Sequence, residues 1–156
     1  MKLSVIGTGY LGAVHAACMA QLGFDVVGID VDEQRISSLA AGVPPFYEPG
    51  FDDVLAKALA SGRLTFTTDM AAAADCDVHF ICVGTPQIEN GIAADLTYVK
   101  RAFAEVAKVA RFALFWFEEI VKRNSPEVNP YPFAAADAAE EMIGMIRQTW
   151  FEKPEQ

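Results

Sequence analysis

The sequence predicts an α/β fold: a doubly wound parallel sheet in the strand order 3-2-1-4, followed by a C-terminal helical pair. Short apolar segments alternate with helix-like segments through the first 95 residues, and glycine, proline or aspartate stands at most of their boundaries. Strands that alternate with helices pair in parallel, because each helix carries the chain back to the start of the next strand. From residue 96 onward the helical period predominates.

Four segments have the composition of strands. Residues 2–6 form a short apolar run that ends at Gly7, as expected for a strand buried on both faces. The later strands are predicted at residues 25–30, 63–67 and 77–83.

Helices are predicted between these strands. They cover residues 11–22, 33–41 and 51–60, with a short alanine-rich turn after Asp69. Asp32 and Asp69 are predicted N-caps, because an aspartate side chain accepts hydrogen bonds from the first N–H groups of a helix. Gly23 and Gly42 stand where helices end, as C-terminal caps often do.

The last third of the chain predicts helices of its own. Asp95 is a suitable N-cap for a helix that begins at Leu96, and apolar residues recur with a helical period as far as residue 121. Another helix is predicted over residues 133–150. The secondary structure of residues 112–117 (FALFWF) stays undecided, because a short apolar run fits a strand as well as a helix.

The turn between the first strand and the first helix carries the pattern G-x-G-x-x-G. In GTGYLG, Gly7 permits the tight turn, Gly9 lets the backbone approach a pyrophosphate, and Gly12 lets the helix pack closely on the strand. The helix N-terminus adds free N–H groups and a partial positive charge. This combination predicts a Rossmann-type dinucleotide site. The alternatives are a turn that binds nothing and a flavin site, which shares the pattern.

An acidic residue stands at the expected distance from the glycine turn. Asp30 ends the second strand, 18 residues after Gly12. A carboxylate there accepts hydrogen bonds from the adenosine ribose and repels a 2′-phosphate, which predicts NAD rather than NADP. If the turn binds nothing, Asp30 is a helix cap.

Two further positions are candidates because of their place in this fold. Ligands bind at the carboxyl ends of the strands, where the strand order reverses between the first and the fourth. Residues 83–86 (VGTP) close the fourth strand, so Thr85 either donates to the cofactor or only ends the strand. Arg35 either lies over the adenine or is a solvated helix charge.

Five stretches resemble the UDP-glucose/GDP-mannose dehydrogenase family, most closely its members that act on UDP-glucose. They are residues 2–12 (KLSVIGTGYLG), 25–32 (DVVGIDVD), 46–50 (FYEPG), 83–86 (VGTP) and 93–99 (AADLTYV), in the family's order. The resemblance ends at about residue 99. We therefore expect an NAD-binding half at residues 1–99 and an atypical helical tail at residues 100–156, packed on it as one compact domain.

The resemblance implies a cofactor, a reaction and a set of contacts. The cofactor is NAD, and the reaction oxidises the C6 alcohol of a nucleotide sugar to a carboxylate while two hydrides pass to two NAD. The implied cofactor contacts are Gly7, Gly9, Tyr10, Leu11, Gly12, Asp30, Arg35, Val83 and Thr85. Glu48 matches the family's loop, but its spacing assigns it no role.

The family's reaction also needs a cysteine nucleophile, and the cysteines here do not fit that role. Cys18, Cys76 and Cys82 have no Lys, Arg or His beside them in the sequence to depress a thiol pKa. We expect small core residues, with Cys18 on the sheet-facing side of its helix. His15 and His79 lack the spacing of a metal site, so structural roles are expected. We therefore predict no catalytic or metal site, and no turnover by this chain alone.

Composition argues against several other classes of protein. The chain has 12 Lys and Arg against 21 Asp and Glu, a net charge of −9, whereas binding to nucleic acid or to an anionic membrane needs a basic face. Apolar stretches fall short of the roughly 20 residues of a membrane span, and the N-terminal residues lack a secretory pattern. We expect a cytoplasmic protein.

Two alternatives to the NAD-binding part of a dehydrogenase stay open. One is a non-catalytic scaffold or assembly module, truncated, fused or designed, that retains the Rossmann architecture. The other is a subunit that takes its catalytic half from a partner chain. The tail's aromatic residues either cover the sheet or form a homo-oligomer interface. These aromatics are Phe112, Phe115, Trp116, Phe117, Trp150 and Phe151.

Overall fold

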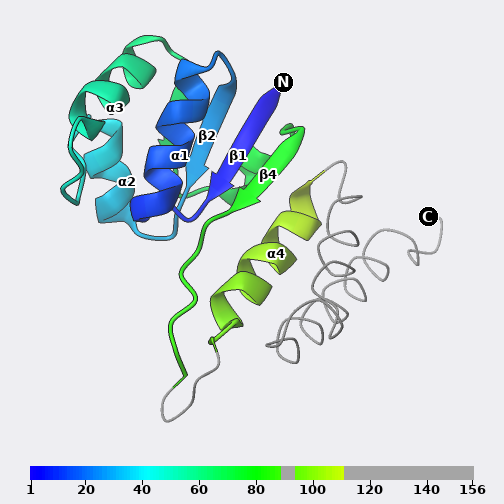
Figure 1. Cartoon of the computed structure of the whole chain (residues 1–156). Helices are drawn as coiled ribbons and strands as arrows, with labels where there is room; N and C mark the ends of the chain where they lie inside the picture. Colours follow the sequence, from blue (N-terminus) through cyan, green and yellow to red (C-terminus); the bar gives the residue numbers. More distant parts are fainter. Residues whose placement is uncertain (89–93, 111–156) are drawn as a thin grey trace, which may run out of the picture. The chain divides into compact units, whose positions relative to one another are not determined.

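The computed structural model describes residues 1–88 and 94–110 (Figure 1). The described residues fall into two units, residues 1–84 with 109–110, and residues 85–88 with 94–108. The predicted helix at 133–150, the ambiguous run at 112–117 and the aromatic residues of the tail lie outside the described residues.

The first unit is built on a four-stranded parallel sheet in the order β3-β2-β1-β4, which confirms the predicted topology. The strands are β1 (Lys2–Ile6), β2 (Asp25–Ile29), β3 (Leu64–Thr67) and β4 (Val78–Ile81). Because all pairs are parallel, the carboxyl ends of the strands lie at one edge of the sheet, the edge where ligands bind in this class of fold.

Three α-helices lie together on one side of this sheet (Figure 1). They are α1 (Tyr10–Gln21), α2 (Glu33–Ala40) and α3 (Phe51–Ala60), and a short 3₁₀-helix, η1 (Met70–Ala73), precedes β4. Both predicted N-caps are confirmed. The Asp32 carboxylate accepts from the Arg35 N–H at 3.0 Å, and the Asp69 carboxylate accepts from the Ala71 N–H at 2.9 Å.

The core lies between the sheet and these helices. Alternate strand residues such as Leu3 and Val5 point to the same face and are buried there. The helices contribute a stripe of alanines on α1 together with larger side chains, among them Leu39 and Leu55, which are fully buried. Small residues on α1 let the helix lie close to the sheet. Its start lies at the carboxyl edge of the sheet because α1 begins only four residues after the last residue of β1.

Cys18 is exposed, so the prediction that it faces the sheet is wrong. The buried residues of α1 are Gly12, Ala13, Ala16, Ala17 and Ala20. A residue turns about 100° from its neighbour in an α-helix, so Cys18 lies about 200° away from Ala16. The sequence does not predict this exposure, because the residues at and around Cys18 are apolar and do not mark which side of the helix is buried.

The second unit contributes one described helix, α4 (Thr97–Val109). The Asp95 carboxylate accepts from the Thr97 N–H at 2.9 Å, as predicted for an N-cap. The helix itself begins at Thr97, one residue after the predicted start. It runs continuously across residues 99 and 100, and the predicted division of the chain at that point stays a prediction. Within the described residues, no helix is both long enough and apolar enough to cross a bilayer.

A polar pair joins β1 to β4 inside the first unit. Ser4 and His79 are register partners, and Ser4 Oγ shares a hydrogen bond of 2.7 Å with His79 Nδ1. His79 Nε2 is buried and has no hydrogen-bond partner in the described part of the chain. Burial lowers the pKa of His79, because the charged imidazolium would lose its hydration.

We expect His79 to make stability depend on pH. The unfolded chain takes up a proton at His79 below a pKa of about 6.5, whereas the folded chain resists protonation until the lowered pKa is reached. The free energy of unfolding is therefore highest above about pH 6.5 and falls as the pH drops through the lowered pKa. Urea unfolding across this range measures the loss. In a His79→Gln variant the free energy of unfolding should fall less over the same pH range. An equal fall would contradict the assignment of this pH dependence to His79.

Candidate dinucleotide-binding site

The glycine turn is shaped by contacts that leave no room for side chains. Gly7 has a φ of +91°, and a Cβ there would lie 2.8 Å from the backbone nitrogen of Val83. A Cβ on Gly12 would lie 1.8 Å from the carbonyl oxygen of Gly7. The Gly7 N–H also donates to the Ile29 carbonyl oxygen at 2.7 Å. The turn is therefore held between the end of β2 and the residues that follow β4.

The first turn of α1 is open to a ligand. Its N-cap is Gly9, and a Cβ there would meet no atom within 4 Å. No side chain described here caps this helix, and its first turn holds no acidic residue. Tyr10 and Leu11 are exposed beside it. A helix N-terminus with free N–H groups, a partial positive charge and open space in front fits a diphosphate.

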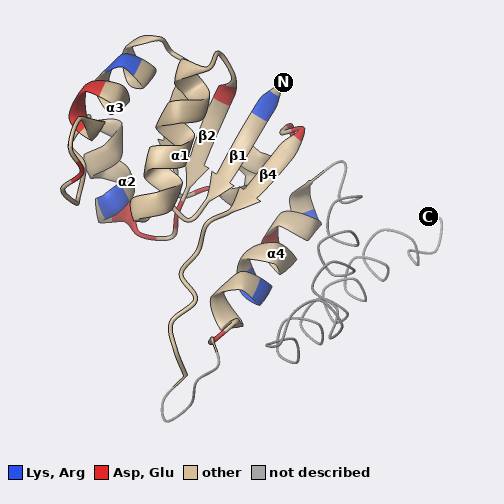
Figure 2. Cartoon of the chain, viewed as in Figure 1, with Lys and Arg blue, Asp and Glu red and all other residues tan. Residues whose placement is uncertain are grey.

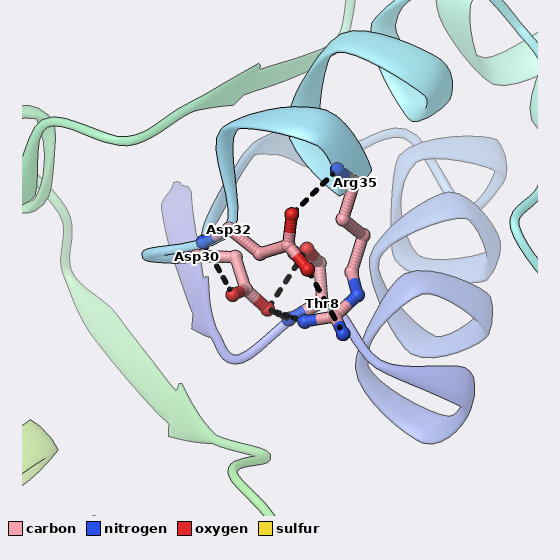
Figure 3. A network of polar contacts seen from close by, with 4 residues as sticks. All are labelled: Thr8, Asp30, Asp32 and Arg35. Carbon is pink, nitrogen blue, oxygen red and sulfur yellow. Dashed lines mark hydrogen bonds and ion pairs between the residues drawn. The ribbon is translucent and has the colours of Figure 1, made fainter.

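Asp30 follows β2 and is the centre of a polar network (Figure 3). Its Oδ2 accepts from the Thr8 N–H at 2.7 Å, from the Thr8 hydroxyl at 3.3 Å and from Arg35 Nη1 at 3.0 Å. Its Oδ1 accepts from the Asp32 N–H at 3.1 Å. Thr8 is fully buried, so the bond from its N–H ties the glycine turn to the end of β2. Oδ1 keeps acceptor capacity, because one oxygen of a carboxylate accepts about two hydrogen bonds.

The network keeps the Asp30 carboxyl group ionised. Burial by itself would raise the pKa of Asp30, but the N–H donors of Asp32 and Thr8 and the Arg35 guanidinium outweigh it and lower the pKa below its usual value. An ionised carboxylate accepts hydrogen bonds and cannot donate them, which suits it to receive the hydroxyl groups of a ribose.

Arg35 is paired with two carboxylates and is not an isolated charge on α2. Its Nη1 pairs with Asp30 at 3.0 Å, and its Nη2 pairs with Asp32 Oδ2 at 3.3 Å. Figure 2 shows basic and acidic residues side by side at the start of α2. The Arg35 side chain as a whole is about one-third exposed.

A loop between α2 and α3 is attached to the glycine turn through Tyr10. The Tyr10 hydroxyl donates to the Glu48 carboxylate, and this bond is the main cause of the raised pKa of Tyr10. The Tyr10 ring lies 5.1 Å from the Phe46 ring, which stacks on Phe51 at 5.4 Å. Phe51 is buried in the core. The loop therefore ties the first residue of α1 to the core through Phe46 and Phe51.

The first unit brings together eight of the nine residues predicted for the site. They are Gly7, Gly9, Tyr10, Leu11, Gly12, Asp30, Arg35 and Val83. Thr85 belongs to the second unit, and its part in the site stays a prediction. The sequence reasoning missed Thr8 and Glu48 as contacts within the site, and it recognised Asp32 as a cap but not as a partner of Arg35.

These features define a Rossmann-type dinucleotide-binding domain: a parallel sheet, a glycine turn at a helix N-terminus and a carboxylate after the second strand. The chain belongs to the UDP-glucose/GDP-mannose dehydrogenase family, because residues 1–124 match that family's NAD binding domain. The predicted family and cofactor are thereby confirmed. The match continues past residue 99, where the sequence reasoning placed its end, and includes α4.

Comparison with individual proteins agrees with this assignment. The chain is 50% identical over 128 residues to the UDP-glucose 6-dehydrogenase TuaD of Bacillus subtilis, covering 81% of this chain and 27% of that protein. The structure of a UDP-glucose dehydrogenase from Pyrobaculum islandicum matches with a TM-score of 0.66 at 47% identity, covering 69% and 25%. A ternary complex of GDP-mannose dehydrogenase from Pseudomonas aeruginosa matches with a TM-score of 0.67 at 41% identity, covering 70% and 25%.

The chain spans about a quarter of the length of the curated relatives it matches. The family match over residues 1–124 includes the glycine turn and Asp30. Among the described residues, no group of three or more His, Cys, Asp or Glu side chains could hold a metal ion.

We expect Gly12 and Gly9 to differ sharply in their tolerance of a side chain. Gly12→Ala should lower the free energy of unfolding by about 1–3 kcal/mol or more, because the new Cβ would overlap the Gly7 carbonyl oxygen. Gly9→Ala should change it by less than about 1 kcal/mol, since open space surrounds that position. Urea unfolding of both variants measures the difference. Equal losses would mean that the turn does not have the described shape.

Proposed function

We propose that this chain is the NAD-binding part of an oxidoreductase that converts UDP-glucose and two NAD to UDP-glucuronate. The observation that carries the proposal is the open N-terminus of α1 beside an ionised carboxylate, Asp30, that is already held in place by backbone donors. The choice of UDP-glucose rests on the resemblance to the UDP-glucose 6-dehydrogenases, which the aligned part of the chain supports.

The proposed contacts follow from the geometry of the turn. The N–H groups at the start of α1 would hold the pyrophosphate in the open space in front of Gly9. Asp30 would accept from the hydroxyl groups of the adenosine ribose, with Arg35 beside it. Val83 closes the turn against Gly7, and Tyr10, Leu11 and Thr85 complete the proposed set of contacts. Bound NAD supplies the hydride acceptor.

The proposal assigns no nucleophile to the two cysteines near β4. Burial is the main cause of the raised pKa of the Cys76 thiol and of the Cys82 thiol, so both resist forming a thiolate. We infer that these 156 residues bind NAD without oxidising a sugar nucleotide by themselves. NADH produced by this chain with UDP-glucose and NAD would contradict that inference.

Calorimetric titration of the purified chain with NAD and with NADP tests the proposal directly. We expect saturable binding of NAD and much weaker binding of NADP, because Asp30 accepts from hydroxyl groups and repels a phosphate. Circular dichroism of the same sample shows whether the chain is folded. If a folded chain binds neither dinucleotide, the glycine turn is only architectural, and the scaffold interpretation takes its place.

Replacing Asp30 tests the residue at the centre of the site. Asp30→Ala should weaken NAD binding by roughly 1.5–3 kcal/mol, because a hydrogen bond to a charged group is lost. Asp25→Ala is the matched control. It removes the same charge and an ion pair with Arg63, at 2.9 Å, from the opposite end of β2. Equal effects of the two variants on NAD binding would show that only overall charge or stability had changed.

A further inference from the structure

The surroundings of Asp30 contain a second carboxylate, Asp32, that is not among the proposed NAD contacts. Asp32 caps α2 with Oδ1, which accepts from the Arg35 N–H at 3.0 Å. Its other oxygen, Oδ2, lies 3.3 Å from Arg35 Nη2. The cap therefore occupies one carboxylate oxygen, and the other is directed at the guanidinium (Figure 3).

The guanidinium is thereby held on two sides. Nη1 faces Asp30 and Nη2 faces Asp32, at 3.0 Å and 3.3 Å. The group of Asp30, Asp32 and Arg35 carries two negative charges and one positive charge. Arginine is the side chain best suited to grip a phosphate, because its planar fork donates two parallel hydrogen bonds. Here both ends of the fork already face carboxylates.

We propose that Asp32 is a specificity-determining residue that excludes NADP by keeping Arg35 from a 2′-phosphate. The inference rests on the proposed function, since it assumes that the adenosine ribose of NAD is bound at Asp30. A 2′-phosphate replaces one of the hydroxyl groups that Asp30 would accept from, so it enters beside this group of charges. The phosphate meets a net negative charge, and the guanidinium that could neutralise it is engaged by Asp32.

This role differs from that of Asp30. Asp30 is buried and receives four hydrogen bonds from protein donors, so it acts on the ribose directly. Asp32 is more exposed, at 43% of its side chain, and it acts through Arg35. Removing the Asp32 charge leaves Asp30 in place but frees Nη2 and makes the group electrically neutral.

The test compares the dissociation constants of NADP and NAD for each variant. Asparagine and serine are good N-caps, so Asp32→Asn and Asp32→Ser keep the cap of α2 while removing the charge. Calorimetric titration should show the ratio of the NADP to the NAD dissociation constant falling about fivefold in both variants. The fall should shrink at high salt, since these charges are partly exposed. A variant that is merely less stable would bind both NAD and NADP more weakly and would leave the ratio of their dissociation constants unchanged.

Glu33→Gln is the matched control, because it removes the same charge from the same helix end. Glu33 lies in the first turn of α2, and in the described structure Arg35 pairs with Asp30 and Asp32. In Glu33→Gln the ratio of the NADP to the NAD dissociation constant should change less than about twofold. An unchanged ratio in the Asp32 variants, or an equal change in Glu33→Gln, overturns the inference while NAD binding still supports the proposed function. Failure of the folded wild-type chain to bind NAD overturns both.

Discussion

The hydrogen bond from the Thr8 N–H to the Asp30 carboxylate holds the site together. It joins the glycine turn after β1 to the end of β2, and both groups are buried. A buried N–H without its acceptor carries a large desolvation cost, so this contact fixes the turn strongly. The same carboxylate receives the Asp32 N–H and the Arg35 guanidinium, which sets where α2 begins. One side chain thus connects two strands, a turn and a helix.

A second set of contacts holds the first residue of α1. Tyr10 is the first residue of α1, and its ring and hydroxyl contact Phe46 and Glu48 of the loop before α3. Because Phe46 stacks on the buried Phe51, the loop connects the start of α1 to the hydrophobic core. These contacts hold the start of α1 to the rest of the domain, while a Cβ at Gly9 would meet open space.

The sequence predicts the fold more completely than it predicts the contacts within the site. Alternating apolar segments and glycine boundaries indicate the strands and their parallel pairing, and the glycine turn after the first strand indicates the strand order because it places the chain in the Rossmann-type class. Asp30 is found by its distance from the glycine turn. The pairing of Arg35 with Asp32 and of Tyr10 with Glu48 depends on side-chain directions and, for the second pair, on a contact across 38 residues. The prediction that Cys18 faces the sheet is wrong because an alanine-rich helix is apolar on nearly every side, so its buried side cannot be read from the sequence.

The central place of β1 has a consequence for synthesis on the ribosome. β1 is made before the other three strands, yet Leu3 pairs with Val26 on one side and with Val78 on the other. One edge of β1 can be filled soon after α1 emerges, whereas the other waits for some 50 further residues. During that interval the exposed edge presents a row of unpaired N–H and C=O groups, the kind of surface on which strands of other chains add. The growing chain thus carries this unpaired edge of β1 until β4 has been translated.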